Sequence, residues 1–244
     1  MFVEQNYYIG YRSIGKDYYI TNKALMTFLE DTGGIHSTKA GTGVMQIETT
    51  NLTWVAIHWI LHVYDRPRYG DVIKVKTWSV DREGEKDNLL YADRDFEVYD
   101  KNEKVIARAT SRWVMINAKT RKIEKLYPEV MNPYKAIKKR SWDGIEFKKL
   151  KEPSQFDKTT KYKIDFRMID FNNHVHNTDY LDFVDVGLPK DIDGQMMNNV
   201  EIMYKKQIVL DDKVNIHYTK QNDEYIITVK SEDDSNLHSI IKLY

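Results

Sequence analysis

Residues 162–187 read YKIDFRMIDFNNHVHNTDYLDFVDVG and contain the pattern that decides the fold. A strand-like run carries Asp170, Asn172 and His174 at every second position, which predicts three polar side chains on one side of an extended chain. An amphipathic segment capped by Asn177 follows and predicts a helix whose free backbone N–H groups point to the same place. A base, two orienting groups and a positive helix end indicate a site for carbonyl chemistry.

The N-terminal region repeats this segment at a fixed offset of 155 residues. Framework residues match along both copies: Arg12 with Arg167, Ile14 with Ile169, Asn22 with Asn177, Leu25 with Tyr180, Phe28 with Phe183 and Leu29 with Val184. Because this offset is too long for a solenoid, it predicts two copies of one small domain. At the three polar positions the first copy has Gly15, Asp17 and Tyr19. We therefore expect one catalytic half and one half retained for binding.

The composition limits the class of protein. The chain has 244 residues, no cysteine and a formal net charge of zero. This length fits two small domains, and the lack of cysteine excludes disulfides, thiolate metal sites and a cysteine nucleophile. Zero net charge argues against a nucleic-acid partner, and no segment approaches the roughly 18 apolar residues of a membrane span. Without an export signal we expect a cytoplasmic protein with no membrane partner.

Both halves show the same order of predicted elements. In the first half, a helix begins at Thr21 or Asn22 and ends near Gly33-Gly34, followed by strands at residues 52–64, 72–80, 91–99 and 105–116. In the second half, a strand at 162–169 and a helix at about 177–186 precede strands at 198–209, 213–219, 224–230 and 237–243. A helix wrapped by an antiparallel meander, twice, predicts an α+β fold of two tandem hotdog units.

These elements also predict the domain boundaries. We expect an N-terminal hotdog domain at residues 1–127, a linker at 128–160 and a C-terminal hotdog domain at 161–244. Around the linker, residues 135–151 carry an excess of basic side chains: Lys135, Lys138, Lys139, Arg140, Lys148, Lys149 and Lys151. The stretch is either a solvated connection or a landing surface that attracts an acidic partner.

One string of residues resembles a known family. Arg167-x-x-Asp170-x-Asn172-x-His174-Val175-x-Asn177-x-x-Tyr180-x-x-Phe183 is similar to the signature of the fatty acyl-ACP thioesterases of bacteria and plant plastids. First-half segments also match that family in order: Tyr11 to Gly15, Leu25 to Thr32, Trp54 to Asp71, and Ser111 to Val114 followed by Thr120-Arg121. The resemblance implies hydrolysis of the thioester between a fatty acyl chain and acyl carrier protein (ACP), in fatty-acid biosynthesis.

Three residues depart from the family pattern. The family usually has Asn in place of His176 and Trp in place of Phe183. It places an acidic residue where this chain has Gln207 after Tyr204-Lys205-Lys206. Because an amide cannot ionise, Gln207 cannot act as a general base.

The chemistry of thioester hydrolysis assigns a role to each candidate. His174 is the candidate general base, since an imidazole near neutral pKa can take a proton from water. Asp170 would fix the tautomer of that imidazole, and Asn172 would position water or the substrate carbonyl. Backbone N–H groups at the start of the second helix would polarise the carbonyl, and Gln207 would orient the water. We expect no cofactor and no metal.

Other interpretations remain open at this stage. Asp170 and Asn172 would serve equally well as caps or loop ties, and His174 with His176 would suit a metal ion. Trp54, Trp59, Tyr64 and Trp78 would line either an acyl tunnel or the core. The alternative functions are an acyl-CoA thioesterase of broader specificity, a hotdog dehydratase and a non-hydrolytic acyl-binding protein. An internal duplication allows a monomer and also a homodimer.

Overall fold

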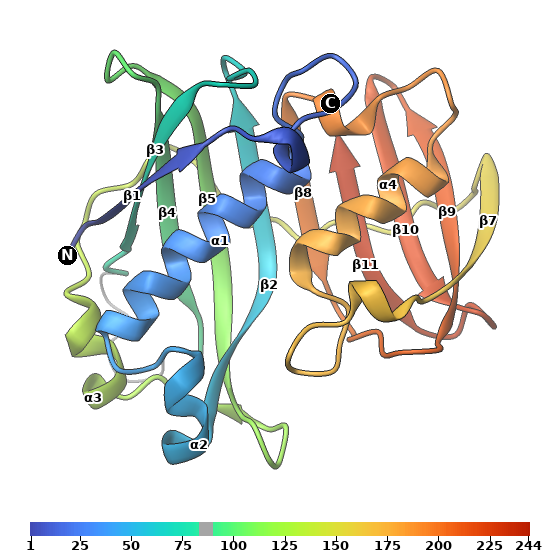
Figure 1. The fold of residues 1–244 in the computed structure, drawn as a ribbon. Helices are drawn as coiled ribbons and strands as arrows, with labels where there is room; N and C mark the ends of the chain where they lie inside the picture. Colours follow the sequence, from blue (N-terminus) through green and yellow to red (C-terminus); the bar gives the residue numbers. More distant parts are fainter. Residues whose placement is uncertain (83–89) are drawn as a thin grey trace. The chain divides into compact units, whose positions relative to one another are not determined.

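The computed structural model describes residues 1–82 and 90–244. The chain divides into two compact units. Unit 1 comprises Met1–Ile20 and Leu25–Phe147, and unit 2 comprises Thr21–Ala24 and Lys148–Tyr244. In each unit an antiparallel sheet carries a helix across one face (Figure 1). The predicted α+β architecture of two helix-and-sheet units is confirmed.

The sheet of unit 1 has the strand order β1-β3-β4-β5-β2, and β6 pairs with β5. Its strands are β1 (Val3–Tyr8), β2 (Leu52–Val63), β3 (Val72–Ser79), β4 (Ala92–Tyr99), β5 (Val105–Asn117) and β6 (Ile123–Glu124). The four strands predicted from the sequence are confirmed to within one residue at either end. Short helical segments connect them: η1 (Tyr11–Ser13), η2 (Val44–Gln46), α2 (Ile47–Thr50), α3 (Pro128–Met131) and η3 (Asn132–Tyr134).

The long helix α1 (Asn22–Lys39) does not end where the sequence predicted. Its start is confirmed, because the Thr21 hydroxyl accepts a hydrogen bond from a backbone N–H of the first turn at 3.1 Å. The expected end at Gly33-Gly34 is wrong. A Cβ atom at Gly33 would lie 3.4 Å from Cδ of Arg94, so the missing side chain makes room for that arginine against the helix. Here glycine serves packing instead of ending the helix.

Arg94 and His36 form a buried pair under this helix. Nη1 of Arg94 lies 2.9 Å from Nδ1 of His36, and Nε2 of His36 lies 3.2 Å from the carbonyl of Tyr134. A guanidinium only donates and a carbonyl only accepts, so Nδ1 accepts, Nε2 carries the hydrogen and the imidazole is neutral. Burial, followed by the charge of Arg94, lowers the pKa of His36 to about 3.

Carboxylates cover the opposite face of the same sheet. Because Arg94 faces the helix, its neighbours Asp93 and Asp95 point to the other side. Arg112 donates to both oxygens of Asp93 at 2.8 and 3.0 Å. Arg140, from the segment after η3, donates to Asp93 at 2.8 Å and to Asp95 at 3.1 Å.

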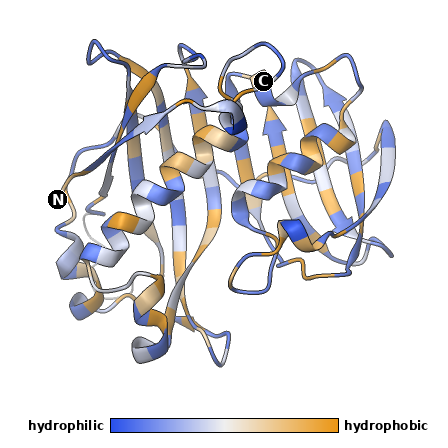
Figure 2. Ribbon diagram, in the orientation of Figure 1, coloured by the Kyte–Doolittle hydropathy of each residue, from blue (hydrophilic) through white to orange (hydrophobic). Residues whose placement is uncertain are grey.

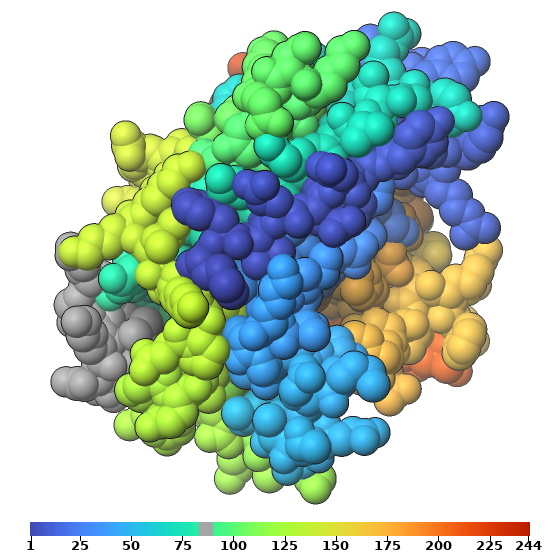
Figure 3. All heavy atoms as spheres, turned by 60° about the vertical axis from the view of Figure 1, so that its left-hand side comes forward, coloured from blue at the N-terminus to red at the C-terminus, as the bar shows by residue number. Residues whose placement is uncertain are grey.

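The basic stretch is therefore neither a solvated linker nor a free landing surface at two of its positions. Arg140 makes the contacts just described, and Lys139 Nζ lies 2.8 Å from a carboxylate oxygen of Glu97. The N-terminal residues lie beside this segment on the face shown in Figure 3. There the Met1 ammonium donates to the carbonyl of Tyr134 at 3.3 Å. These contacts hold the connection against unit 1.

The sheet of unit 2 has the strand order β8-β11-β10-β9-β7. Its strands are β7 (Lys158–Lys163), β8 (Asn199–Tyr204), β9 (Lys213–Gln221), β10 (Glu224–Ser231) and β11 (Leu237–Leu243). The predictions for 213–219, 224–230 and 237–243 are confirmed. The strand expected at 198–209 ends already at Tyr204, and that expected at 162–169 lies earlier, at β7. Helical segments are η4 (Phe166–Met168), η5 (Asn177–Leu181), α4 (Asp182–Gly187) and η6 (Gly194–Met196).

Helix α4 lies close against the sheet of unit 2. A Cβ atom at Gly187 would lie 2.7 Å from Cδ1 of Ile227 and 2.9 Å from Cγ2 of Ile216, so only glycine fits there. Hydrophobic and hydrophilic residues alternate along the strands (Figure 2). On the other face, Leu150 packs against a buried apolar cluster and the ring of Phe156 stacks on His217 at 4.0 Å. In the described part of the chain, no helix has the length and apolar character needed for a membrane crossing.

The neutral His36 predicts a loss of stability in acid. In the unfolded chain His36 takes up a proton below its ordinary pKa of 6.5, whereas in the fold it stays neutral down to about pH 3. The unfolded state then binds more protons, so stability falls as the pH drops from 6.5 towards 3, by about 3 kcal/mol at pH 4. Urea unfolding followed by tryptophan fluorescence reports on unit 1, because all five tryptophans lie there. The stability of His36→Gln, whose side chain does not titrate, is expected to lose this part of the pH dependence. The same pH dependence in the variant and the wild type would refute the role of His36.

Candidate active site

The segment that carries the three polar residues is a closed turn and not an extended strand. Ile169 and Val175 form an isolated antiparallel bridge, and the N–H of Asp170 donates to the carbonyl of His174 at 2.8 Å. Asn173 has a φ of 63°, a left-handed conformation that Asn tolerates better than most residues. The expectation of an extended run is therefore wrong, because the chain reverses direction at Asn173.

The turn brings Asp170, Asn172 and His174 together. Oδ1 of Asp170 accepts the backbone N–H of Asn172 at 2.8 Å and that of His174 at 3.3 Å. All three residues are half-buried. One carboxylate oxygen thus organises the backbone that carries the candidate base, while the other oxygen remains available to a side chain.

That second oxygen faces His176. Nδ1 of His176 lies 3.8 Å from Oδ2 of Asp170, and the side chains are 35% and 16% exposed. The pKa of Asp170 lies below its ordinary value. Burial raises this pKa, but the combined lowering by His176 and by the N–H groups of His174 and Asn172 is larger. The carboxyl group is therefore ionised at neutral pH.

The helical segment after the turn begins where the sequence predicted, but it is not an α-helix throughout. Its first part, η5, is a 3-10 helix, and α4 continues it to Gly187. The capping position is occupied by His176, whose side chain makes no capping hydrogen bond to the helix, so the expectation that Asn177 is the cap is wrong. The N–H of His176 donates to the carbonyl of Met168 at 2.9 Å, which closes the base of the turn.

Gln207 lies in an exposed loop that is tied to this turn. The N–H of Val175 donates to the carbonyl of Ile208 at 2.9 Å. Val175 follows His174 and Ile208 follows Gln207, so this hydrogen bond brings the two segments together. Nδ1 of the buried His238 lies 3.0 Å from the carbonyl of Lys206 and is the donor there. His238 fixes this loop from β11, and sequence analysis missed it because no spacing links it to the motif.

Two tyrosines complete the surroundings of the turn. The hydroxyl of Tyr204 donates to the carbonyl of Asn177 at 2.9 Å, and its ring lies 5.0 Å from that of Tyr180. Burial, followed by the charge of Asp170, raises the pKa of Tyr180. Both residues belong to the segments singled out from the sequence, but nothing in the spacing showed that they meet.

Unit 1 contains the same turn without the polar trio. Three features recur at positions 155 residues apart. The bridge Ile14–Ile20 corresponds to Ile169–Val175, and the left-handed residue Tyr18 (φ 65°) corresponds to Asn173. The closing hydrogen bond from Gly15 N–H to Tyr19 O (2.9 Å) corresponds to that from Asp170 N–H to His174 O. The duplication inferred from the sequence is thus present in the backbone. Because Gly15 closes its turn without a side chain, the carboxylate of Asp170 is not needed for the turn to form.

The twin turn also has a counterpart of Gln207. The N–H of Ile20 donates to the carbonyl of Pro67 at 3.0 Å, as that of Val175 does to Ile208. Arg66, which precedes Pro67, therefore occupies the position of Gln207. Its Nη1 donates to the carbonyl of Ile20 at 2.9 Å. A side chain at this position can thus reach the turn.

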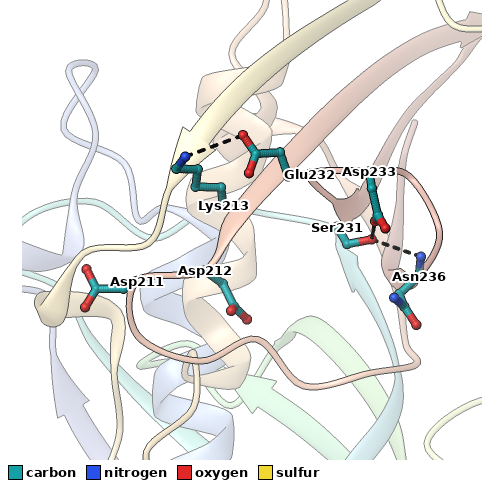
Figure 4. A pocket seen from close by; sticks show the side chains of 7 residues that line it. All are labelled: Asp211, Asp212, Lys213, Ser231, Glu232, Asp233 and Asn236. Carbon is teal, nitrogen blue, oxygen red and sulfur yellow. Dashed lines mark hydrogen bonds and ion pairs between the residues drawn. The ribbon is translucent and has the colours of Figure 1, made fainter.

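Among the described residues, neither a metal cluster nor the acidic pocket at the strand ends offers an alternative site for an acyl thioester. Among residues 1–82 and 90–244, no group of three or more His, Asp or Glu side chains is placed to hold a metal ion. A pocket of about 580 Å³ lies at the ends of β9 and β10 (Figure 4). Its lining residues are Asp211, Asp212, Lys213, Ser231, Glu232, Asp233 and Asn236. This acidic, polar lining does not suit an acyl chain.

Comparison with known proteins identifies the family. Residues 1–134 match the acyl-ACP thioesterase N-terminal domain, and residues 151–242 match the acyl-ACP thioesterase C-terminal domain. The chain belongs to the acyl-ACP thioesterase family. The resemblance noted from the sequence is confirmed.

Members of the acyl-ACP thioesterase family among plant proteins share about a quarter of the sequence. An oleoyl-acyl carrier protein thioesterase of Coriandrum sativum is 26% identical over 231 residues, which cover 84% of this chain and 58% of the relative. A palmitoyl-acyl carrier protein thioesterase of Arabidopsis thaliana is 28% identical over 216 residues, which cover 83% of this chain and 51% of the relative. The chain thus spans a little over half the length of these relatives.

Solved structures of acyl-ACP thioesterases share the fold. One from Bacteroides thetaiotaomicron has a TM-score of 0.83 at 22% identity and covers 99% of this chain and 96% of that one. The 12:0-ACP thioesterase from Umbellularia californica has a TM-score of 0.85 at 20% identity, with the same coverage. The double hotdog fold predicted from the sequence is confirmed.

The two hydrogen bonds accepted by Asp170 predict different effects for two substitutions. Asp170→Asn keeps an oxygen that can accept both N–H groups, so the turn should stay intact. Asp170→Ala removes the acceptor and should destabilise unit 2 by about 1 kcal/mol. Hydrogen exchange of residues 170–176 is expected to be faster in Asp170→Ala and unchanged in Asp170→Asn. Equal exchange in both variants would show that the side chain does not organise the turn.

Proposed function

We propose that the protein is a thioesterase that hydrolyses fatty acyl-ACP to a free fatty acid and holo-ACP. The observation that carries this proposal is the closed turn that holds Asp170, Asn172 and His174, whereas its twin in unit 1 keeps the backbone and lacks the trio. A fold maintained by packing alone has no need of an ionised carboxylate there. Membership of the acyl-ACP thioesterase family supports the same reaction.

In the proposed mechanism, His174 takes a proton from a water molecule as that water attacks the thioester carbonyl carbon. The carbonyl electrons move to oxygen and return as the carbon–sulfur bond breaks. The thiolate that leaves receives the proton held by His174, which restores the neutral imidazole. Asn172 is placed to position the water or the carbonyl, and the ionised Asp170 favours the imidazolium that forms in between. Gln207 donates a hydrogen bond that orients the water.

The same proposal assigns a partner to the protein and a separate role to each half of the chain. The relatives are named for oleoyl- and palmitoyl-acyl carrier protein substrates, so an acyl carrier protein with a phosphopantetheine-linked acyl chain is the proposed partner. Residues 161–244 supply the catalytic groups, and residues 1–127 bind the acyl chain. The duplicated turn that lost its trio supports the assignment of binding to the first half.

Replacing the candidate base tests the proposed reaction. With a panel of acyl-ACPs and the matching acyl-CoAs, thiol release should be faster from acyl-ACP, and His174→Ala should lower kcat by at least about 100-fold, the range for loss of a general base. Equal rates on acyl-CoA would favour an acyl-CoA thioesterase. Binding of acyl-ACP without hydrolysis by the wild type would favour an acyl-binding protein.

Gln207 provides a second test of the water-activating groups. If Gln207 only orients the water, Gln207→Glu adds a carboxylate where the family usually has an acidic residue and should raise kcat several-fold near pH 7. Gln207→Ala, the matched control, should lower kcat while leaving KM within about twofold. The same rate in all three proteins would remove Gln207 from the mechanism.

A further inference from the structure

The carboxylate of Asp170 lies close to a second histidine, His176, as well as bonding to the backbone of the candidate base His174. Its Oδ1 accepts backbone N–H groups, and the imidazole at ion-pair distance from Oδ2 is that of His176. Asp179, another carboxylate close in sequence, has Nζ of Lys23 at 2.8 Å. Among these two carboxylates, Asp170 is therefore the partner that the structure gives to His176.

The geometry of His176 is fixed from both sides. Its N–H donates to the carbonyl of Met168, and its own carbonyl accepts the N–H of Asp179, each at 2.9 Å. These bonds hold the backbone where the turn meets η5. The closed turn therefore sets the backbone position from which the imidazole reaches Asp170.

The twin turn shows that the fold does not require this pair. At the offset of 155 residues, Gly15 corresponds to Asp170 and Thr21 corresponds to His176. The twin keeps the hydrogen bond from the N–H of Gly15 to the carbonyl of Tyr19, although it has no carboxylate at the position of Asp170 and no imidazole at the position of His176. A carboxylate–imidazole pair that the backbone does not need, in the same turn as a candidate base, points to a chemical role.

We propose that His176 is a positioning residue: it holds Oδ2 of Asp170 and keeps that carboxylate ionised and oriented while His174 acts on the substrate. This inference rests on the proposed thioesterase function. The groups close to the pair are the phenol of Tyr180 and the backbone N–H groups of Asn172 and His174. A protonated imidazole attracts a carboxylate more strongly than a neutral one does, so the contribution of His176 grows as the pH falls.

The test compares the wild type with His176→Asn, which restores the residue usual in the family and leaves the turn intact. The rates of the two proteins should converge at high pH, where an imidazole is deprotonated. As the pH is lowered, kcat of the variant should fall by up to about tenfold relative to the wild type, with KM little changed. His176→Gln should behave in the same way, since it also lacks a titratable group.

A second measurement separates this proposal from the proposed function. NMR titration of the ¹³C-labelled carboxyl of Asp170 requires no turnover, and its pKa should be higher in His176→Asn than in the wild type. An unchanged titration, or parallel pH–rate profiles, would overturn the positioning role. If the titration moves but no acyl thioester is hydrolysed by the wild type, the pair stands and the thioesterase assignment fails.

Discussion

Each sheet in this protein has two faces to cover, and the helix covers only one of them. The central strands are buried on both faces: every residue from Asp93 to Val98 in β4, and Ile226 to Val229 in β10. The chain meets this constraint with its own connecting segment. In unit 1 that segment brings Arg140 to the buried carboxylates, since a buried charge without a partner would be strongly destabilising. In unit 2 it contributes Leu150 and Phe156. The connection is therefore part of both cores.

The strands were predictable because alternation and turn residues mark them locally. Gly70-Asp71, for example, precedes β3 closely enough to fix its start. Two of the predictions that failed show the physical reason clearly. Period-two spacing of polar residues also arises in a turn, and the tolerance of Asn173 for a left-handed conformation was the signal against a strand. Gly33-Gly34 looked like a helix end because its packing partner, Arg94, lies far along the chain.

The candidate site was predictable as a set of residues but not as a set of contacts. The motif placed Asp170 and His174 in one segment, and the structure keeps them in one turn. Spacing could not tell which imidazole meets the carboxylate, because that depends on how tightly the chain reverses at Asn173. Loop contacts were equally hidden, since His238 holds the loop of Gln207 from a strand with no sequence signal of its own.

The duplicated turn explains how one half of the chain can carry chemistry and the other half none. The hydrogen bond that joins the ends of the turn, from Asp170 to His174 and from Gly15 to Tyr19, is the same in both copies, so the side chains at the three polar positions are free to differ. Burying a carboxylate at Asp170 is unfavourable by itself. In unit 2 the opposing interactions come from the turn itself, through two N–H groups and His176. Gain or loss of the polar groups therefore needs no change in the sheet or in α4, which is the condition under which a duplicated fold can specialise.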